Sequence, residues 1–155
     1  MPDSHYRFVT HWTIDAPAEA VWDELHGLRA WPSWWRGVLA VDPLEAGDDN
    51  GLGARYRLVM RSVMPYRLAF NVKTTRLVRP TTIEAHADGE LTGVGLWTLT
   101  PTGAGTAARY DWDVEASKPW MRALAPVARP IFEWNHDVIM RWGEQGLTKR
   151  LGARK

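Results

Sequence analysis

Apolar and polar residues alternate along much of this chain, and a period of two predicts β-strands with one buried face. The first strand is expected over residues 6–14, where Phe8, Trp12 and Ile14 alternate with polar neighbours. The same extended pattern recurs near residues 38–44, 53–62, 66–78, 81–88, 93–100 and 106–115. Short segments containing Gly, Pro, Asn or Asp connect these strands, so we predict an antiparallel meander.

Helical periodicity appears in three places. A short helix is expected over residues 18–26, directly after an Asp-Ala-Pro sequence that suits a helix start. Residues 31–35 predict a second brief helical segment, and residues 120–151 predict a long amphipathic helix. We expect a kink or break where Pro126 and Pro130 each remove a backbone donor from this last helix.

The last helix is expected to turn one apolar face toward the sheet. Its members are Ile131, Trp134, Val138, Ile139 and Trp142. Asn135 lies inside this predicted stripe, whereas His136 is expected on the polar flank. Leaving a buried carboxamide unpaired costs about 1–3 kcal/mol. Two interpretations of Asn135 therefore stay open: it bonds to a neighbouring backbone carbonyl or indole N–H, or its amide anchors a ligand.

The alternation also divides the predicted sheet into an apolar inner face and a charged outer face. Inner positions include Tyr56, Met60, Phe70, Tyr110 and Trp112. A helix about 10 Å wide cannot fill the concavity of a seven-stranded sheet, so we predict a cavity between the two. The charged positions 84, 86, 88 and 90 share the outer face and are expected to be solvated rather than to bind a metal.

Composition narrows the classes of function. The chain has 19 Lys+Arg against 18 Asp+Glu, with no basic run of the kind that binds nucleic acid. It has no cysteine, and its five histidines are scattered, so we expect no thiol chemistry, no metal site and no cofactor. No apolar run approaches the about 18 residues of a membrane span. We expect a single cytoplasmic domain over residues 1–155 and leave open whether it forms a homodimer.

Three segments together resemble a known protein family. They are residues 16–22 (APAEAVW), 89–97 (GELTGVGLW) and 134–144 (WNHDVIMRWGE). With the order of elements, they resemble the polyketide cyclase/dehydrase-like branch of the SRPBCC superfamily, which also contains START domains and birch-pollen-allergen-like proteins. The resemblance implies an α+β helix-grip fold, in which a seven-stranded curved antiparallel sheet wraps around a long C-terminal helix. Two short helices are expected between the first and second strands.

The resemblance and the inner-face residues together predict a protein that binds a hydrophobic small molecule, aromatic or polycyclic, inside this cavity. The expected ligand-binding residues are Tyr56, Met60, Phe70, Trp97, Tyr110, Trp112, Ile131 and Asn135, with Trp34 and Trp35 at the cavity mouth. The assignment of Trp97 depends on strand register, because Leu96 would face inward if the register were shifted by one residue.

Two alternative functions stay open at this point. One is a polyketide cyclase or dehydratase, in which positioning favours one intramolecular aldol condensation. Its proton-transfer group would be Tyr110 or Tyr56, or His86 with Glu84 if the strand faces were reversed. The other is a protein-binding co-activator, for which the only candidate surface is the indole cluster of Trp31, Trp34 and Trp35.

Overall fold

The computed structural model describes residues 5–63, 67–116 and 119–152. Its elements follow the order expected from the alternation of apolar and polar residues. They are β1 (His5–Ile14), α1 (Ala18–His26), the short 3-10 turn η1 (Leu28–Ala30), α2 (Trp31–Trp34), β2 (Val38–Glu45), β3 (Arg55–Arg61), β4 (Arg67–Val78), β5 (Thr82–Gly89), β6 (Leu91–Thr102), β7 (Gly105–Ala116) and α3 (Pro119–Gly152). The predicted α+β class and the two short helices between the first two strands are confirmed.

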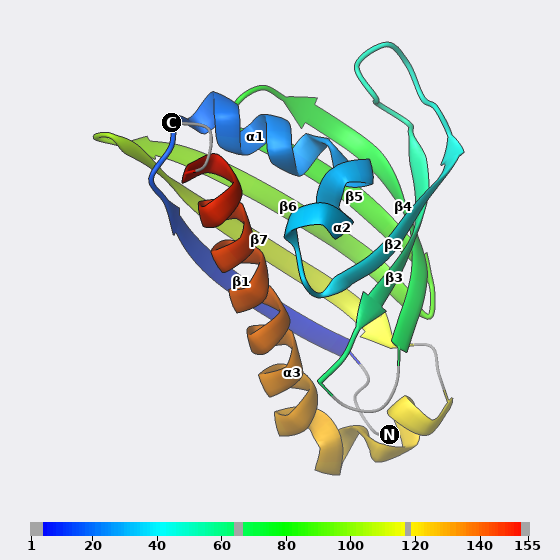
Figure 1. Ribbon diagram of the computed structural model, residues 1–155. Coiled ribbons are helices and arrows are strands. Elements are labelled where there is room, and N and C mark those ends of the chain that lie inside the picture. Colours follow the sequence, from blue (N-terminus) through cyan, green and yellow to red (C-terminus); the bar gives the residue numbers. More distant parts are fainter. Residues whose placement is uncertain (1–4, 64–66, 117–118, 153–155) are drawn as a thin grey trace.

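The strands form one curved sheet of seven strands in the order β1-β7-β6-β5-β4-β3-β2. Every neighbouring pair is antiparallel, as the short connections predict. Figure 1 shows the sheet curling around α3, with α1 and α2 near the C-terminal end of that helix. The helix-grip arrangement expected from the family resemblance is therefore confirmed.

The helix α3 runs without interruption from Pro119 to Gly152, so of the predicted kink or break it has no break. Figure 1 shows its first turns, in yellow, at an angle to the orange and red remainder. Nothing in the described part of the chain is a helix both long and apolar enough to cross a membrane.

The buried face of α3 is rotated by one residue from the predicted face. The side chains that turn toward the sheet include Phe132, Asn135, Ile139, Met140, Leu147 and Leu151. Two members of the predicted stripe are exposed instead, because Ile131 keeps 42% and Trp134 keeps 55% of its accessible surface. Two apolar rows run along this helix, and hydropathy alone does not tell which row packs.

Two glycines decide which row of α3 packs. A Cβ added at Gly143 would lie 2.6 Å from the Trp35 ring and 2.7 Å from the Trp12 ring. A Cβ added at Gly146 would lie 1.7 Å from the carbonyl oxygen of Trp34. Because the helix approaches these groups so closely, only the helix face that carries the two glycines can pack here. The bulky Trp134 lies on another face and is left in solvent.

Polar contacts hold the C-terminal half of α3 in place. Arg150 pairs with Glu24 of α1, a carboxylate that is only 8% exposed. The carboxylate of Glu144 accepts a hydrogen bond from the backbone N–H of Thr13 at 2.8 Å, and the indole N–H of Trp35 donates to the carbonyl of Ile139 at 2.9 Å. These contacts fix the position of the helix above the sheet.

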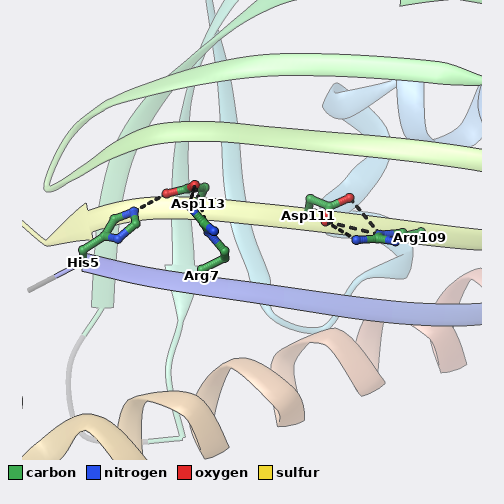
Figure 2. A network of polar contacts seen from close by, with 5 residues as sticks. All are labelled: His5, Arg7, Arg109, Asp111 and Asp113. Atoms are coloured by element: carbon green, nitrogen blue, oxygen red, sulfur yellow. Dashed lines mark hydrogen bonds and ion pairs between the residues drawn. The ribbon is translucent and has the colours of Figure 1, made fainter.

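The outer face of the sheet is polar and its side chains pair with one another, as predicted. Figure 2 shows His5 and Arg7 of β1 directed at the carboxylate of Asp113 on β7, and Arg109 paired with Asp111. The carboxylate of Asp113 has a pKa below its ordinary value, chiefly because it accepts a hydrogen bond from His5. These charges are therefore balanced across neighbouring strands at Asp113 and along one strand at Asp111.

Candidate ligand cavity

A cavity of about 160 Å³ lies between the concave face of the sheet and α3. Apolar and aromatic side chains from β1, β3, β4, β5, β6 and β7 form one wall, and α3 forms the other. Among the predicted ligand-binding residues, those that line it are Met60, Phe70, Trp97, Tyr110, Trp112 and Asn135. From the predicted mouth, Trp35 lines it as well. The strand alternation thus predicts most of the sheet wall.

Three predicted positions lie outside the cavity lining. Ile131 is exposed, because α3 presents its neighbouring row to the sheet. Tyr56 is half-buried and packs against core residues near the edge of the sheet, where β3 lies next to the edge strand β2. Trp34 is buried at 8% exposure, with its backbone pressed against Gly146 of α3, so it is a packing residue rather than part of the mouth.

An aromatic wall crosses the centre of the sheet. Trp97 is 4% exposed and pairs in register with Ile83 on one side and Tyr110 on the other, so Trp97 rather than Leu96 faces inward. Its ring centroid lies 4.4 Å from that of Tyr110, and Tyr110 stacks in turn on Trp112 at 5.8 Å. These stacks fix the orientation of the three rings.

Gly95 makes room for the Tyr110 side chain. A Cβ added at Gly95 would lie 2.3 Å from the Tyr110 hydroxyl and 3.0 Å from the Trp112 ring. Burial raises the pKa of Tyr110 above its ordinary value, so the phenol stays protonated at neutral pH and can donate a hydrogen bond. Within the described residues, this hydroxyl has no hydrogen-bond partner.

Asn135 is held by the fold through its oxygen. Its Oδ1 accepts a hydrogen bond from the backbone N–H of Val63 at 2.8 Å and one from the Ser62 hydroxyl at 3.1 Å. The backbone donor identifies the oxygen end of the amide, so Nδ2 is the group that remains. No acceptor for Nδ2 is found among the residues that the structure describes. The amide is thus bound within the fold, but by a backbone N–H and a hydroxyl rather than by the expected backbone carbonyl or indole N–H. The second interpretation, that the amide anchors a ligand, stays open for Nδ2.

His136 lines the cavity, which corrects the expectation that it lies on the polar flank. Its side chain is 13% exposed, and its ring stacks on Phe8 with centroids 4.1 Å apart and planes 11° apart. Burial lowers its pKa to about 4, so the imidazole is neutral at pH 7. In the described part of the chain neither ring nitrogen has a hydrogen-bond partner, and the Asp137 carboxylate is 4.0 Å from Nδ1, beyond hydrogen-bond distance.

The one-residue rotation of α3 explains why periodicity alone misses His136. Once Gly143 faces the sheet, positions three, four and seven residues earlier turn inward with it. Those positions are Met140, Ile139 and His136. In the sequence, the position of Gly143 was therefore the signal that His136 faces inward. Hydropathy did not give this signal, because it ranks histidine as polar.

Charged side chains are missing from the described lining of the cavity, which contains no Asp, Glu, Lys or Arg. His86 and Glu84 lie on the outer face, where Glu84 accepts a hydrogen bond from Thr75, so they are not an acid/base pair of the cavity. Among the described residues there is also no group of side chains suited to hold a metal ion.

Comparison with solved structures shows the same fold in several proteins. A protein from Thermus thermophilus is 18% identical, with 97% of this chain and 99% of that chain covered and a TM-score of 0.74. The Zhui aromatase/cyclase from Streptomyces sp. R1128 is 16% identical, with 97% and 95% covered and a TM-score of 0.75. A START superfamily protein from Mycobacterium smegmatis is 15% identical, with 97% and 99% covered and a TM-score of 0.75. At such identities the likeness concerns the fold.

The sequence itself identifies the family. In a comparison with curated proteins, nothing matches the chain. The family model described as polyketide cyclase / dehydrase and lipid transport matches residues 5–150, which is nearly the whole chain and includes all seven strands and most of α3. The chain therefore belongs to the polyketide cyclase/dehydrase and lipid transport family.

Proposed function

We propose that this protein binds a hydrophobic aromatic small molecule in the cavity between its sheet and α3. The observation that carries the proposal is the cavity itself, whose wall of Phe70, Trp97, Tyr110 and Trp112 offers flat apolar surfaces. Pockets of this kind, mostly apolar with a few polar groups, are typical of small-molecule sites.

The energetics of the cavity support a bound ligand. The apolar side chains that line the cavity have no partner atoms on that side, so they forgo part of their dispersion contacts. A ligand that fills the space restores the dispersion contacts that its lining residues lack.

The chemistry of the lining favours binding over cyclisation. A general base is most effective when its pKa lies near the operating pH. Burial moves the pKa values of His136 and Tyr110 away from pH 7, because it lowers that of the histidine to about 4 and raises that of the tyrosine. Neither group therefore exchanges a proton readily at pH 7. Steric shape and fixed hydrogen bonds are what this wall can supply.

The co-activator alternative receives no support from the indole cluster. Trp34 and Trp35 are 8% and 3% exposed, and the indole N–H of Trp31 donates to the backbone carbonyl of Glu24. These rings pack against one another and against α3, and they do not form an exposed apolar patch.

Calorimetric titration and thermal melting with toluene test the proposed function. We expect saturable binding and a rise in melting temperature, because a ligand present at a hundred times its Kd stabilises the folded state by about 2.7 kcal/mol. Ala85→Phe, which fills the cavity from β5, should abolish both effects. The matched control is Ala107→Phe at an exposed position of β7, which should leave them unchanged. If toluene neither binds saturably nor stabilises the wild-type protein, the proposal is wrong.

A further inference from the structure

We infer that the ligand is an uncharged carbonyl compound with a single aromatic ring, and that Tyr110 donates the hydrogen bond to its carbonyl oxygen. The inference rests on the proposed function, because it names the ligand class of the same cavity. Three properties of the cavity carry it: its size, its lack of charge, and an excess of unpaired hydrogen-bond donors over acceptors.

The size of the cavity favours a ligand with one ring. A buried apolar cavity of about 150 Å³ is known to bind benzene, and the cavity here measures about 160 Å³. Sites for drug-sized ligands are larger, about 300–1,000 Å³. The polycyclic ligand that the sequence left open is therefore disfavoured, as is a long chain that must fold back on itself.

The lining excludes a charged ligand. A carboxylate or an ammonium group inside this cavity would find no side chain of opposite charge among the described lining residues. Burying an unpaired charge costs several kcal/mol, more than one hydrogen bond returns. Aromatic acids and amines are therefore expected to stay in water.

The unpaired polar groups of the wall are mainly donors. The Tyr110 hydroxyl, the Asn135 Nδ2 and the indole N–H groups of Trp97 and Trp112 have no acceptor among the described residues. Oδ1 of Asn135 is already used by Val63 and Ser62, and one ring nitrogen of neutral His136 remains as an unpaired acceptor, so the unpaired donors still outnumber the unpaired acceptors. A ligand that offers an acceptor and no donor fits this imbalance, and a carbonyl oxygen is such a group.

Tyr110 is the donor best prepared for this role. Its ring is held by stacking on Trp97 and Trp112, and its hydroxyl lies against Gly95. A donor fixed before the ligand arrives loses little entropy on binding. Because burial keeps the phenol protonated, it remains a donor throughout the neutral pH range.

A series of probes with nearly the same shape tests the inference on the wild-type protein. Ethylbenzene has no polar group, acetophenone has an acceptor, 1-phenylethanol has an acceptor and a donor, benzoate is charged, and 2-acetylnaphthalene adds a ring. By isothermal titration calorimetry we expect acetophenone to bind about tenfold more tightly than ethylbenzene, as one hydrogen bond of about 1.4 kcal/mol requires. We expect 1-phenylethanol between them, and no binding of benzoate or 2-acetylnaphthalene.

Tyr110→Phe then assigns the donor, because it removes one oxygen and keeps the stacked ring. It should reduce the preference for acetophenone over ethylbenzene to about twofold or less, with the affinity for ethylbenzene nearly unchanged. Equal affinity of the wild-type protein for the two probes, or tighter binding of benzoate, would overturn the inference and leave the proposed function intact. Absence of binding by every probe, toluene included, would remove the proposed function itself. The wild-type series decides the ligand class even if the variant does not fold.

Discussion

The two faces of the sheet differ in whether their polar groups have partners. On the outer face, polar side chains pair with their neighbours: Arg109 with Asp111, and Asn71 with Asp88 across β4 and β5. On the inner face, the hydroxyl of Tyr110 and the indole N–H of Trp97 find no partner among the described residues. The same strands carry both sets, one residue apart.

This difference shows where a binding site can be recognised. The outer groups are satisfied by one another and by water, so their energetic contribution is small. A buried donor without a partner is a cost to the folded state, about 1–3 kcal/mol for each group. In this protein the groups that indicate a ligand are therefore the neutral, unpaired ones of the inner face rather than the charges on the surface.

The largest expected contrast between the faces is in stability, at adjacent residues of β6. Trp97→Ala removes a ring that packs on Trp12 at 4.8 Å and on Tyr110 at 4.4 Å. It should lower the free energy of unfolding by about 3–5 kcal/mol. Thr98→Ala, on the exposed face of the same strand, should change it by less than about 0.5 kcal/mol. Urea denaturation measures both, and similar losses at the two positions would contradict the assignment of faces.

The next contrast concerns pH. Because burial lowers the pKa of His136 from 6.5 to about 4, the unfolded chain takes up this proton first as the pH falls. The contribution of neutral His136 is fully present above pH 6.5 and is lost progressively down to pH 4, and the loss approaches about 3 kcal/mol.

His136→Phe separates this contribution from that of the other titrating groups. The variant should keep the stacking on Phe8 and lose the part of the pH dependence that belongs to His136. Denaturation curves between pH 4 and 7 provide the measurement, and wild-type and variant curves that run parallel would show that His136 titrates normally.

A smaller contrast compares two asparagines. Asn135→Leu leaves the backbone N–H of Val63 without its acceptor and should cost about 2 kcal/mol in the free energy of unfolding. Asn71→Leu on the outer face removes a solvent-exposed hydrogen bond to Asp88 and should cost less than about 0.5 kcal/mol. If thermal unfolding ranks the two variants in the opposite order, the fold does not depend on the oxygen of Asn135.

The smallest expected effect is at Asp113 on the outer face. Asp113→Asn removes the charge that faces His5 and Arg7, and the free energy of unfolding should fall by less than about 1 kcal/mol. The difference should disappear in 1 M NaCl, where charges are screened beyond about 3 Å. A difference that persists at high salt would mean that this network does more than pair surface charges.

The fold could be predicted from the sequence because its alternation is regular. Strand residues such as Phe70, Tyr110 and Trp112 face inward as expected, since a strand has only two faces and one of them is charged. The buried face of the helix was harder to predict, because two apolar rows run along α3. The close contacts at Gly143 and Gly146 determine which of them packs against the sheet. The same one-residue rotation exposes Ile131 and brings His136 into the wall.

The site was predicted less completely than the fold, for a physical reason. Lining residues follow from periodicity, but whether a polar atom is paired depends on contacts between segments far apart in the chain. The hydrogen bond from Val63 to Asn135 joins residues 72 positions apart, so no local sequence pattern predicts it. The same holds for Trp34, which the approach of Gly146 buries instead of leaving it at the mouth.

That bond between Val63 and Asn135 also gives the protein an internal reporter. The amide hydrogen of Val63 is protected by a side chain of α3 rather than by a neighbouring strand. Its exchange with deuterated water therefore requires the segment that follows β3 to part from α3, next to a residue that lines the cavity. The exchange rate of a single backbone proton would thus record how often this contact opens, without any probe attached to the protein.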